Sequence, residues 1–257
     1  MSSDYNDLVL SRVSDLLKKA DKTKRPCASC FYAPADLCDI QKINAPLGVT
    51  YKLWGGHLLA ERKVLTAYPD FLDFDDEGLN DASNITVLHI TNTARKSLSH
   101  RDFLGALMSM GIERDRIGDI LIRDDEAVVF ICSSIVDYIE QNLEKVGSCR
   151  VNIERMTSIG PSFLKKFLPK KERRVVIIPS MRLDCVIADV YSLSRSDAQR
   201  LIRSESVRIN YKTCANSDKS LVHGDLVSVS GKGRFEISDI EGNTKKGNIR
   251  LGVLIYI

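Results

Sequence analysis

The strongest constraint on the fold is a regular alternation of two residue patterns in the middle third of the chain. Short runs rich in Val, Ile and Thr alternate with longer segments whose apolar residues recur three or four positions apart. The first pattern is typical of strands and the second of amphipathic helices. The expected elements are strand 85–90, helix 99–111, strand 117–122, strand 127–132, helix 134–146 and strand 149–153. This β-α-β-β-α-β order predicts a ferredoxin-like split motif.

The parts flanking this motif predict an α+β protein of three parts. Residues 1–80 are expected to form a mostly helical region, residues 81–178 the ferredoxin-like domain and residues 179–257 a separate C-terminal domain. Within the first part, residues 58–65 are expected to be helical. Residues 70–81 are acidic and lack a clean period, so they are expected to form an exposed linker or loop.

The charge is divided unevenly along the chain, although the net charge is only +3. Residues 1–160 contain 19 Lys and Arg against 24 Asp and Glu, a net of −5, whereas residues 161–257 contain 18 against 10, a net of +8. A basic end on an acidic body indicates a polyanion as partner, with a solvated basic tail as the alternative. The cations of the segment 163–174 fit phosphate contacts and a solvated linker equally well.

Composition also bears on the compartment. No run of eighteen apolar residues is present, so no membrane span is expected, and the N-terminus lacks the features of a signal peptide. A cytoplasmic protein is therefore expected.

Its seven cysteines are expected to be reduced. Cys27 and Cys30 have the spacing of a metal knuckle, with Cys38 and His57 as further possible ligands, but no second pair exists. We expect ordinary thiols and no metal.

The basic end contains two expected helices followed by short strands. Ser180 is expected to cap a helix that starts at Met181, and Ser194 to cap the next one together with Asp197 in a capping box. Arginine suits this surface because its planar fork grips phosphate oxygens and stacks on bases. Asp184 and the later Asp225 are expected to make turns or orient arginines rather than to catalyse. The expected RNA-binding residues are Arg182, Arg195, Arg200 and Arg203, supported by Arg208, Lys212, Lys232 and Arg234.

The ferredoxin-like order also occurs in RNA-recognition domains, which stack bases on aromatic residues of the third strand. Here residues 126–132 contain one aromatic residue, Phe130, and no Lys or Arg. We therefore expect the middle domain to be a scaffold or a protein-facing surface.

The C-terminal motifs resemble a known RNA-binding domain. Arg-Leu-Asp at 182–184, Leu-Ser-Arg-Ser at 193–196, Val-Arg-Ile-Asn at 207–210 and Gly-Asp at 224–225 are similar to the S4-like domain. The resemblance implies that two helices and the adjoining hairpin of residues 179–257 grip structured RNA, mainly rRNA or tRNA. Two positions depart from the family pattern, because Glu205 and Tyr211 stand where glycine is common.

Further blocks resemble the YlmH family and span nearly the whole chain in order. They lie at residues 55–63, 99–107, 111–112, 118–121 and 231–235. The resemblance implies a ribosome-associated quality-control factor in translation that has no catalysis and no cofactor. It further implies binding of 23S rRNA and tRNA on the large ribosomal subunit, beside peptidyl-tRNA. We expect a monomer that carries out this role during rescue of stalled translation.

Enzyme motifs are weak. His100-Arg101-Asp102 is similar to a kinase catalytic loop, but the asparagine expected five residues after the aspartate is Leu107. No phosphate-binding loop, dinucleotide fingerprint or zinc-protease motif is present. Two alternatives remain open at this point. One is an RNA-modifying enzyme of the pseudouridine synthase or methyltransferase type, and the other is a protein-binding adaptor in cell division.

Overall fold

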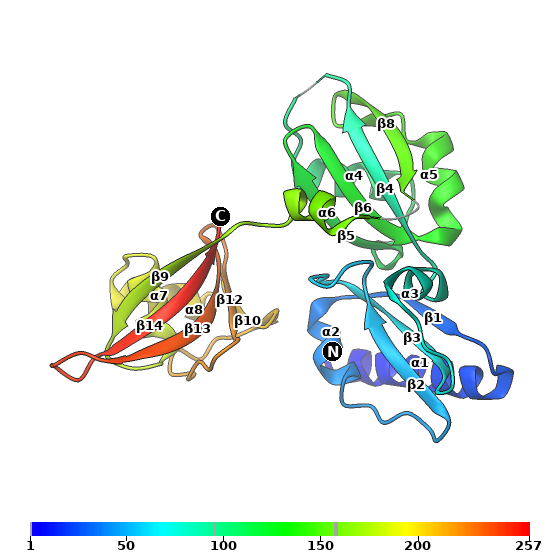
Figure 1. Cartoon of the computed structure of the whole chain (residues 1–257). Helices are drawn as coiled ribbons and strands as arrows, with labels where there is room; N and C mark the ends of the chain where they lie inside the picture. Colours follow the sequence, from blue (N-terminus) through cyan, green and yellow to red (C-terminus); the bar gives the residue numbers. More distant parts are fainter. Residues whose placement is uncertain (1, 95, 157–158) are drawn as a thin grey trace. The chain divides into compact units, whose positions relative to one another are not determined.

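The computed structural model describes residues 2–94, 96–156 and 159–257 (Figure 1). It contains two compact units, Met1–Leu168 and Pro169–Ile257, which we call the front unit and the C-terminal unit. Three sheets organise these units, two in the first and one in the second. The prediction of an α+β protein is confirmed.

The first part of the front unit combines helices with a small antiparallel sheet of order β1-β3-β2. Its elements are α1 (Ser2–Thr23), β1 (Cys27–Tyr32), α2 (Pro34–Ile40), β2 (Val49–Trp54), β3 (Lys63–Pro69) and α3 (Asp76–Ala82). The apolar stripe of α1, which includes Val13 and Leu17, is buried in a core that also contains Leu65 and Ala67 of β3.

Two sequence expectations for this part were wrong. Residues 58–65 are not helical, because the chain turns before Lys63 and then enters the central strand β3. Pairing on both sides buries β3, and such long-range pairing overrides local helical spacing. The expected linker 70–81 includes most of α3, whose first turn is capped by Asp75 through a 2.8 Å hydrogen bond from the Gly78 N–H.

The second part of the front unit confirms the ferredoxin-like prediction. Its elements are β4 (Ile85–Asn92), α4 (His100–Ser109), η1 (Arg114–Arg116), β5 (Ile117–Arg123), β6 (Glu126–Cys132), η2 (Ser133–Ile135), α5 (Val136–Asn142), β7 (Lys145–Val146), β8 (Cys149–Met156) and α6 (Pro161–Phe167). The antiparallel sheet has the order β5-β6-β4-β8-β7, in which β4 and β6 are central. The helix expected to reach residue 146 ends at Asn142 because β7 pairs with β8.

The C-terminal unit is a six-stranded antiparallel sheet with two helices. Its elements are β9 (Lys171–Ile178), α7 (Leu183–Val190), α8 (Arg195–Arg203), β10 (Val207–Ile209), β11 (Lys212–Thr213), β12 (Leu226–Val229), β13 (Gly233–Asn243) and β14 (Ile249–Tyr256). The strand order is β11-β10-β12-β13-β14-β9. Figure 1 shows α7 and α8 on one face of this sheet, where their apolar residues share one core with those of the strands.

Strand β9 places the start of the C-terminal unit earlier than the sequence suggested. All eight residues of β9 pair with β14, so the strand is part of the C-terminal sheet rather than of the ferredoxin-like domain expected to end at residue 178. The boundary between the two compact units accordingly lies between Leu168 and Pro169.

The first helix of this unit also starts later than expected. Ser180 does not cap it, since α7 begins at Leu183 with Arg182 as its N-cap. A β-bridge between Arg182 and Ser220 holds the preceding backbone extended. The Leu183 and Asp184 N–H groups donate to carbonyls of the 217–219 loop, which satisfies the first helical turn without a capping side chain.

None of the described helices is both long and apolar enough to cross a membrane.

Candidate nucleic-acid interface

A buried carboxylate organises the basic surface of the C-terminal unit. Asp184, in the first turn of α7, has a side chain that is 0% exposed. It accepts hydrogen bonds from Arg182 through Nε and Nη2, both at 3.1 Å, and from Arg195 Nε at 3.0 Å. Gln199 Nε2 adds a fourth at 2.7 Å. We call these four residues the Asp184 hub.

The hub fixes the charge state of its centre. Burial acts to raise the pKa of Asp184, but hydrogen bonds from Arg182, Gln199 and Arg195 outweigh it and hold the pKa well below its usual range. The carboxylate is therefore ionised at neutral pH. This geometry confirms the expectation that Asp184 orients arginines.

The hub holds two arginines at the protein surface in fixed orientations. The side chain of Arg182 is 35% exposed, and it also pairs with Asp218. Arg195 is 53% exposed and forms a single hydrogen bond, through Nε, within the described part of the chain. Both Nη groups of Arg195 are thus available to an external acceptor. A guanidinium held in place loses less conformational freedom when it binds a phosphate.

Helix α8 carries the other expected arginines. The predicted N-cap is confirmed, because Ser194 Oγ accepts the Asp197 N–H at 3.1 Å; Ser194 Oγ also donates to the Asp197 carboxylate at 2.7 Å, in place of the backbone bond of a capping box. Arg200 forms an ion pair with the same carboxylate at 2.6 Å, while Arg203 is exposed at the last residue of the helix. Arg195, Gln199 and Arg203 lie four positions apart on α8, and the first two belong to the Asp184 hub.

The remaining candidates lie on the sheet and its turns rather than around the hub. Arg208 of β10 pairs in register with Ser228 of β12, which pairs with Arg234 of β13. Neighbours of these residues along each strand are buried in the core with α7 and α8. Since side chains alternate between faces, this row lies on the opposite face of the sheet. Lys212 lies in β11, and Lys232 is exposed in the turn before β13.

One aromatic residue at this surface was not among the residues expected from the sequence. Tyr256 lies at the end of β14, and the guanidinium carbon of Arg234 is 4.4 Å from the centroid of its ring. Lys171 Nζ is 4.7 Å from the same centroid. The alternation of β14 gave a signal, because Leu251 and Val253 face the core and Tyr256 is on the other parity.

Asp225 makes a turn, as expected. Its carboxylate accepts the Val222 N–H at 2.9 Å and the Asn210 side-chain amide at 2.8 Å. The Asn210 oxygen in turn accepts the Leu226 N–H at 2.9 Å. These bonds tie the start of β12 to the end of β10 and leave Asp225 in a structural role.

The ferredoxin-like part of the front unit gives no sign of base stacking on β6, which is the third strand of its motif. Phe130 of β6 is 0% exposed, and its ring centroid is 4.8 Å from that of His57. It shares a core with Phe31 and Trp54 of the N-terminal part. Among the described residues, no three His, Cys, Asp or Glu side chains gather as metal ligands.

Three comparisons with known proteins bear on this arrangement of an α+β front unit and a basic C-terminal unit. A family model described as "Putative RNA-binding domain in YlmH" matches residues 80–159. The ribosome-associated protein quality control protein P2 of Bacillus subtilis (strain 168) is 28% identical over 228 residues, covering 86% of this chain and 84% of the relative.

A solved structure is also similar to part of the chain. The cell division protein ylmH from Streptococcus pneumoniae has a TM-score of 0.51 at 19% identity, covering 59% of this chain and 91% of that one. The three matches confirm the resemblance to the YlmH family. The family model describes residues 80–159 as an RNA-binding domain, which differs from our expectation of a scaffold. The burial of Phe130 excludes base stacking at that residue alone, and not RNA binding by the rest of the domain.

Proposed function

We propose that this protein binds ribosomal RNA and tRNA on the large ribosomal subunit, without catalysis, during rescue of stalled translation. The observation that carries the proposal is the Asp184 hub, which presents Arg182 and Arg195 at the surface of a basic unit. The name of the Bacillus subtilis relative, a ribosome-associated protein quality control protein, supports the ribosome as partner. A ribosomal partner would place this activity in the cytoplasm.

The hub is suited to binding rather than to proton transfer. Its carboxylate is fully buried and accepts four hydrogen bonds, so it has no position from which to take a substrate proton. The arginines it orients can each offer a planar fork to phosphate oxygens. Phosphate contacts of this kind fix the register of a protein on folded RNA without reading its sequence. We therefore favour a non-catalytic RNA-binding role over an RNA-modifying enzyme.

Crosslinking in cells, followed by sequencing of the bound RNA, tests this proposal. We expect 23S rRNA and tRNA to be recovered together with large ribosomal subunits. Recovery of mRNA alone, or of no RNA, would contradict it. Protein partners that are retained when the hub arginines are replaced would instead favour an adaptor role in cell division.

A single variant tests the hub directly. Arg195→Ala should weaken binding to large subunits by about 1–3 kcal/mol, because it removes a charge-assisted contact to phosphate. The matched control is Arg123→Ala in the front unit, whose side chain is 51% exposed against 53% for Arg195. Quantitative co-sedimentation with purified subunits measures both. Equal affinities of the two folded variants would remove Arg195 from the interface.

A further inference from the structure

One row of side chains crosses the open face of the C-terminal sheet. Paired residues continue from β11 through β10 and β12 to β13, and from β14 to β9. The register between β13 and β14, in which Phe235 faces Ile255, brings Arg234 beside Tyr256 and closes the gap. The row is formed by Thr213, Arg208, Ser228, Arg234, Tyr256 and Lys171.

Near one end of this row, an aromatic ring is flanked by two cations. Arg234 and Lys171, on the strands either side of β14, lie 4.4 Å and 4.7 Å from the Tyr256 ring centroid. Contacts of this length are within the range of cation–π attraction, and Arg can also stack its plane on the ring. The Arg234 guanidinium is thereby held over the sheet surface. It forms, with Tyr256, a composite stacking platform.

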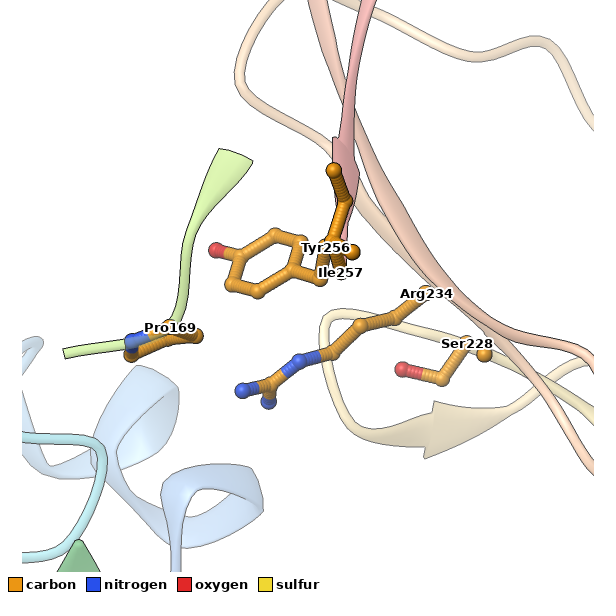
Figure 2. Close-up of a pocket in the computed structure, with 6 residues that line it drawn as sticks. Pro169, Ser228, Arg234, Tyr256 and Ile257 are labelled. Atoms are coloured by element: carbon orange, nitrogen blue, oxygen red, sulfur yellow. The ribbon is translucent and has the colours of Figure 1, made fainter. Parts of the chain in front are cut away.

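A surface pocket of about 400 Å³ opens at this platform (Figure 2). Its lining residues are Pro169, Ser228, Gly233, Arg234, Tyr256 and Ile257. The pocket thus combines flat apolar walls with two hydroxyls, of Ser228 and Tyr256, and one cation. Gly233 has a φ of 103° and no side chain to fill the space, and a Cβ built there would meet no atom within 4 Å. Ligand pockets in proteins commonly start at volumes of about 300 Å³.

The charges on this face differ between its two ends. At the far end, Arg173 pairs with Asp239 and Glu241, and Arg250 pairs with the same Glu241. At the pocket end, Arg208 is exposed and has no ion-pair partner among the described residues. Lys171, on the same row, pairs with Glu236 at 2.7 Å. An anionic ligand is therefore favoured beside Arg208, and not at the far end.

A ligand with both a flat ring and a negative charge satisfies this pocket. We propose that it takes one unstacked nucleotide of a single-stranded RNA segment, with the base against Arg234 and Tyr256 and the phosphate toward Arg208. The inference deepens the proposed function and rests on it. A duplex is a poorer fit because its bases are stacked on each other, so that their faces are not available to a protein ring. This pocket is separate from the Asp184 hub, which lies on the helices.

The test compares single-stranded and double-stranded RNA on the full chain. Fluorescence anisotropy would measure binding of a labelled ten-nucleotide RNA and of a ten-base-pair RNA duplex. Arg234→Lys keeps the charge but removes the planar guanidinium, so it should weaken binding of the single strand roughly tenfold, as expected for one lost stacking contact. Duplex binding should change less than twofold. Tyr256→Leu should give the same selective loss.

The matched control is Arg250→Lys, the same substitution at the ion-paired end of the same face. It should leave both affinities unchanged. Equal losses for single strand and duplex in Arg234→Lys would overturn the pocket, because they would indicate charge alone. Unchanged affinity for the single strand would overturn it as well. Arg234→Lys conserves size and charge, so this result does not depend on whether Tyr256→Leu folds.

Co-sedimentation separates this inference from the proposed function. If the wild-type protein binds large subunits and Arg195→Ala weakens this binding, but Arg234→Lys leaves single-strand affinity unchanged, only the pocket is wrong. If the wild-type protein fails to bind large subunits, the proposed function itself is wrong, and the pocket inference, which rests on it, is overturned too.

Discussion

At the scale of single residues, the buried carboxylate of Asp184 dominates the C-terminal unit. A buried charge is stable only when it is paired and hydrogen-bonded, and its removal leaves the partners uncompensated. Asp184 satisfies two arginines and one amide while being fully buried itself. The same contacts therefore stabilise the fold and orient the arginines of the proposed RNA-binding surface. A substitution here should affect both properties together.

Replacing Asp184 by Asn should destabilise the protein by about 2–4 kcal/mol at pH 7, since it removes one partner of a buried charged network. Asp218→Asn is the matched control. Asp218 also pairs with Arg182, but its side chain is 64% exposed, so its loss should change stability by at most about 1 kcal/mol. Urea denaturation measures both. Similar effects of the two substitutions would show that burial of Asp184 contributes nothing.

The hydrogen bonds of Asp184 also determine how the stability difference between wild type and Asp184→Asn depends on pH. The folded-state pKa of Asp184 is lowered, so its stabilisation is fully present above the unfolded value of about 3.9 and is lost as pH falls below it toward the folded pKa. The gap in stability between wild type and Asp184→Asn should therefore be constant from about pH 7 to pH 5 and narrow in stronger acid. Denaturation series at each pH would check this. A stability gap that widens in acid would contradict a lowered pKa of Asp184 in the folded state.

At the scale of elements, the two departures from the S4-like pattern occur at left-handed backbone positions. Helix α8 ends with the Ser206 N–H bonded to the Leu201 carbonyl and the Glu205 N–H bonded to the Ile202 carbonyl, which is a Schellman ending. Glu205 has a φ of 57° there. Asn210 and Tyr211, with φ of 49° and 68°, form the tight hairpin turn between β10 and β11. Glycine is common at such positions because it lacks the Cβ that creates the strain.

Glu205→Gly should raise the free energy of unfolding by about 0.5–1 kcal/mol, because relief of the left-handed strain exceeds the added freedom of the unfolded chain. The control is Ser204→Gly at the preceding residue, where φ is −81° and no strain is relieved. That variant should be neutral or slightly destabilising. Thermal and urea unfolding of both variants would decide. A loss of stability in Glu205→Gly would contradict the backbone explanation.

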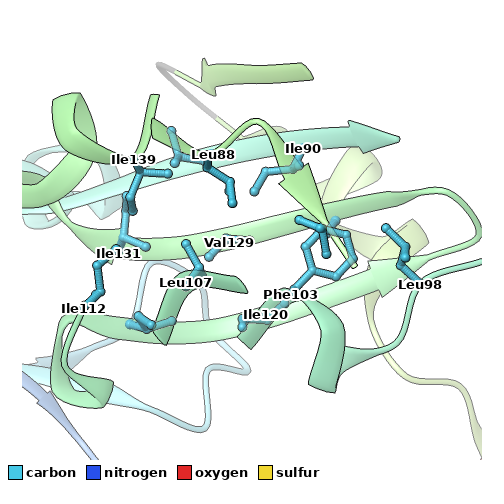
Figure 3. Packing of buried hydrophobic residues seen from close by; sticks show 14 of the residues in the cluster. Leu88, Ile90, Leu98, Phe103, Leu107, Ile112, Ile120, Val129, Ile131 and Ile139 are labelled. Atoms are coloured by element: carbon cyan, nitrogen blue, oxygen red, sulfur yellow. The ribbon is translucent and has the colours of Figure 1, made fainter. Parts of the chain in front are cut away.

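The ferredoxin-like elements could be predicted because their information is local. Each strand and helix shows its own apolar period, and these residues meet in one core, where Leu107 and Phe103 of α4 pack on Ile90 and Val129 of the sheet (Figure 3). The small sheet β1-β3-β2 could not be predicted in this way. Its central strand follows a turn whose spacing imitates a helix, and only pairing with segments far along the chain makes it a strand.

The candidate site, too, could be predicted from the sequence only in part. Residue types and helical spacing placed Arg182 and Arg195 among the candidates, and the Ser194 cap located the start of α8. Side-chain partners were beyond reach, because Gln199 joins Asp184 only through the packing of two helices. Tyr256 was missed since its neighbours Arg234 and Lys171 come from strands more than twenty residues away in sequence.

At the scale of the whole molecule, several family-like motifs form a joint inside the front unit rather than a ligand site. A Cβ on Gly118 would lie 2.6 Å from a ring carbon of Phe31, and one on Gly56 would lie 2.2 Å from Phe130. Between them, Asp119 accepts the backbone N–H groups of Glu61 and Arg62 at 2.8 and 3.0 Å. The glycines therefore allow the N-terminal sheet to approach the ferredoxin-like sheet closely.

Gly118→Ala should destabilise the front unit by about 1–3 kcal/mol, because the added methyl group overpacks the core against Phe31. Gly105→Ala supplies a control of opposite sign. Gly105 lies inside α4, where an added methyl group would meet nothing within 4 Å, so alanine there should stabilise by about 0.5–1 kcal/mol through helix propensity. Urea denaturation reports both changes. A neutral Gly118→Ala would mean that the joint can relax at no cost.

The uneven charge of the chain determines how the whole molecule should respond to salt. Residues 161–257 carry a net charge of +8, while the rest is acidic, so RNA contacts should concentrate on the C-terminal unit. If about five phosphates are neutralised, the slope of log affinity against log salt concentration should lie near −3.5 to −4.5. Titrations of rRNA fragments at several salt concentrations measure this slope. Arg195→Ala should make it shallower by roughly one unit, because one phosphate contact is lost. A flat slope in the wild type would instead indicate that binding is carried by uncharged contacts or by a protein partner.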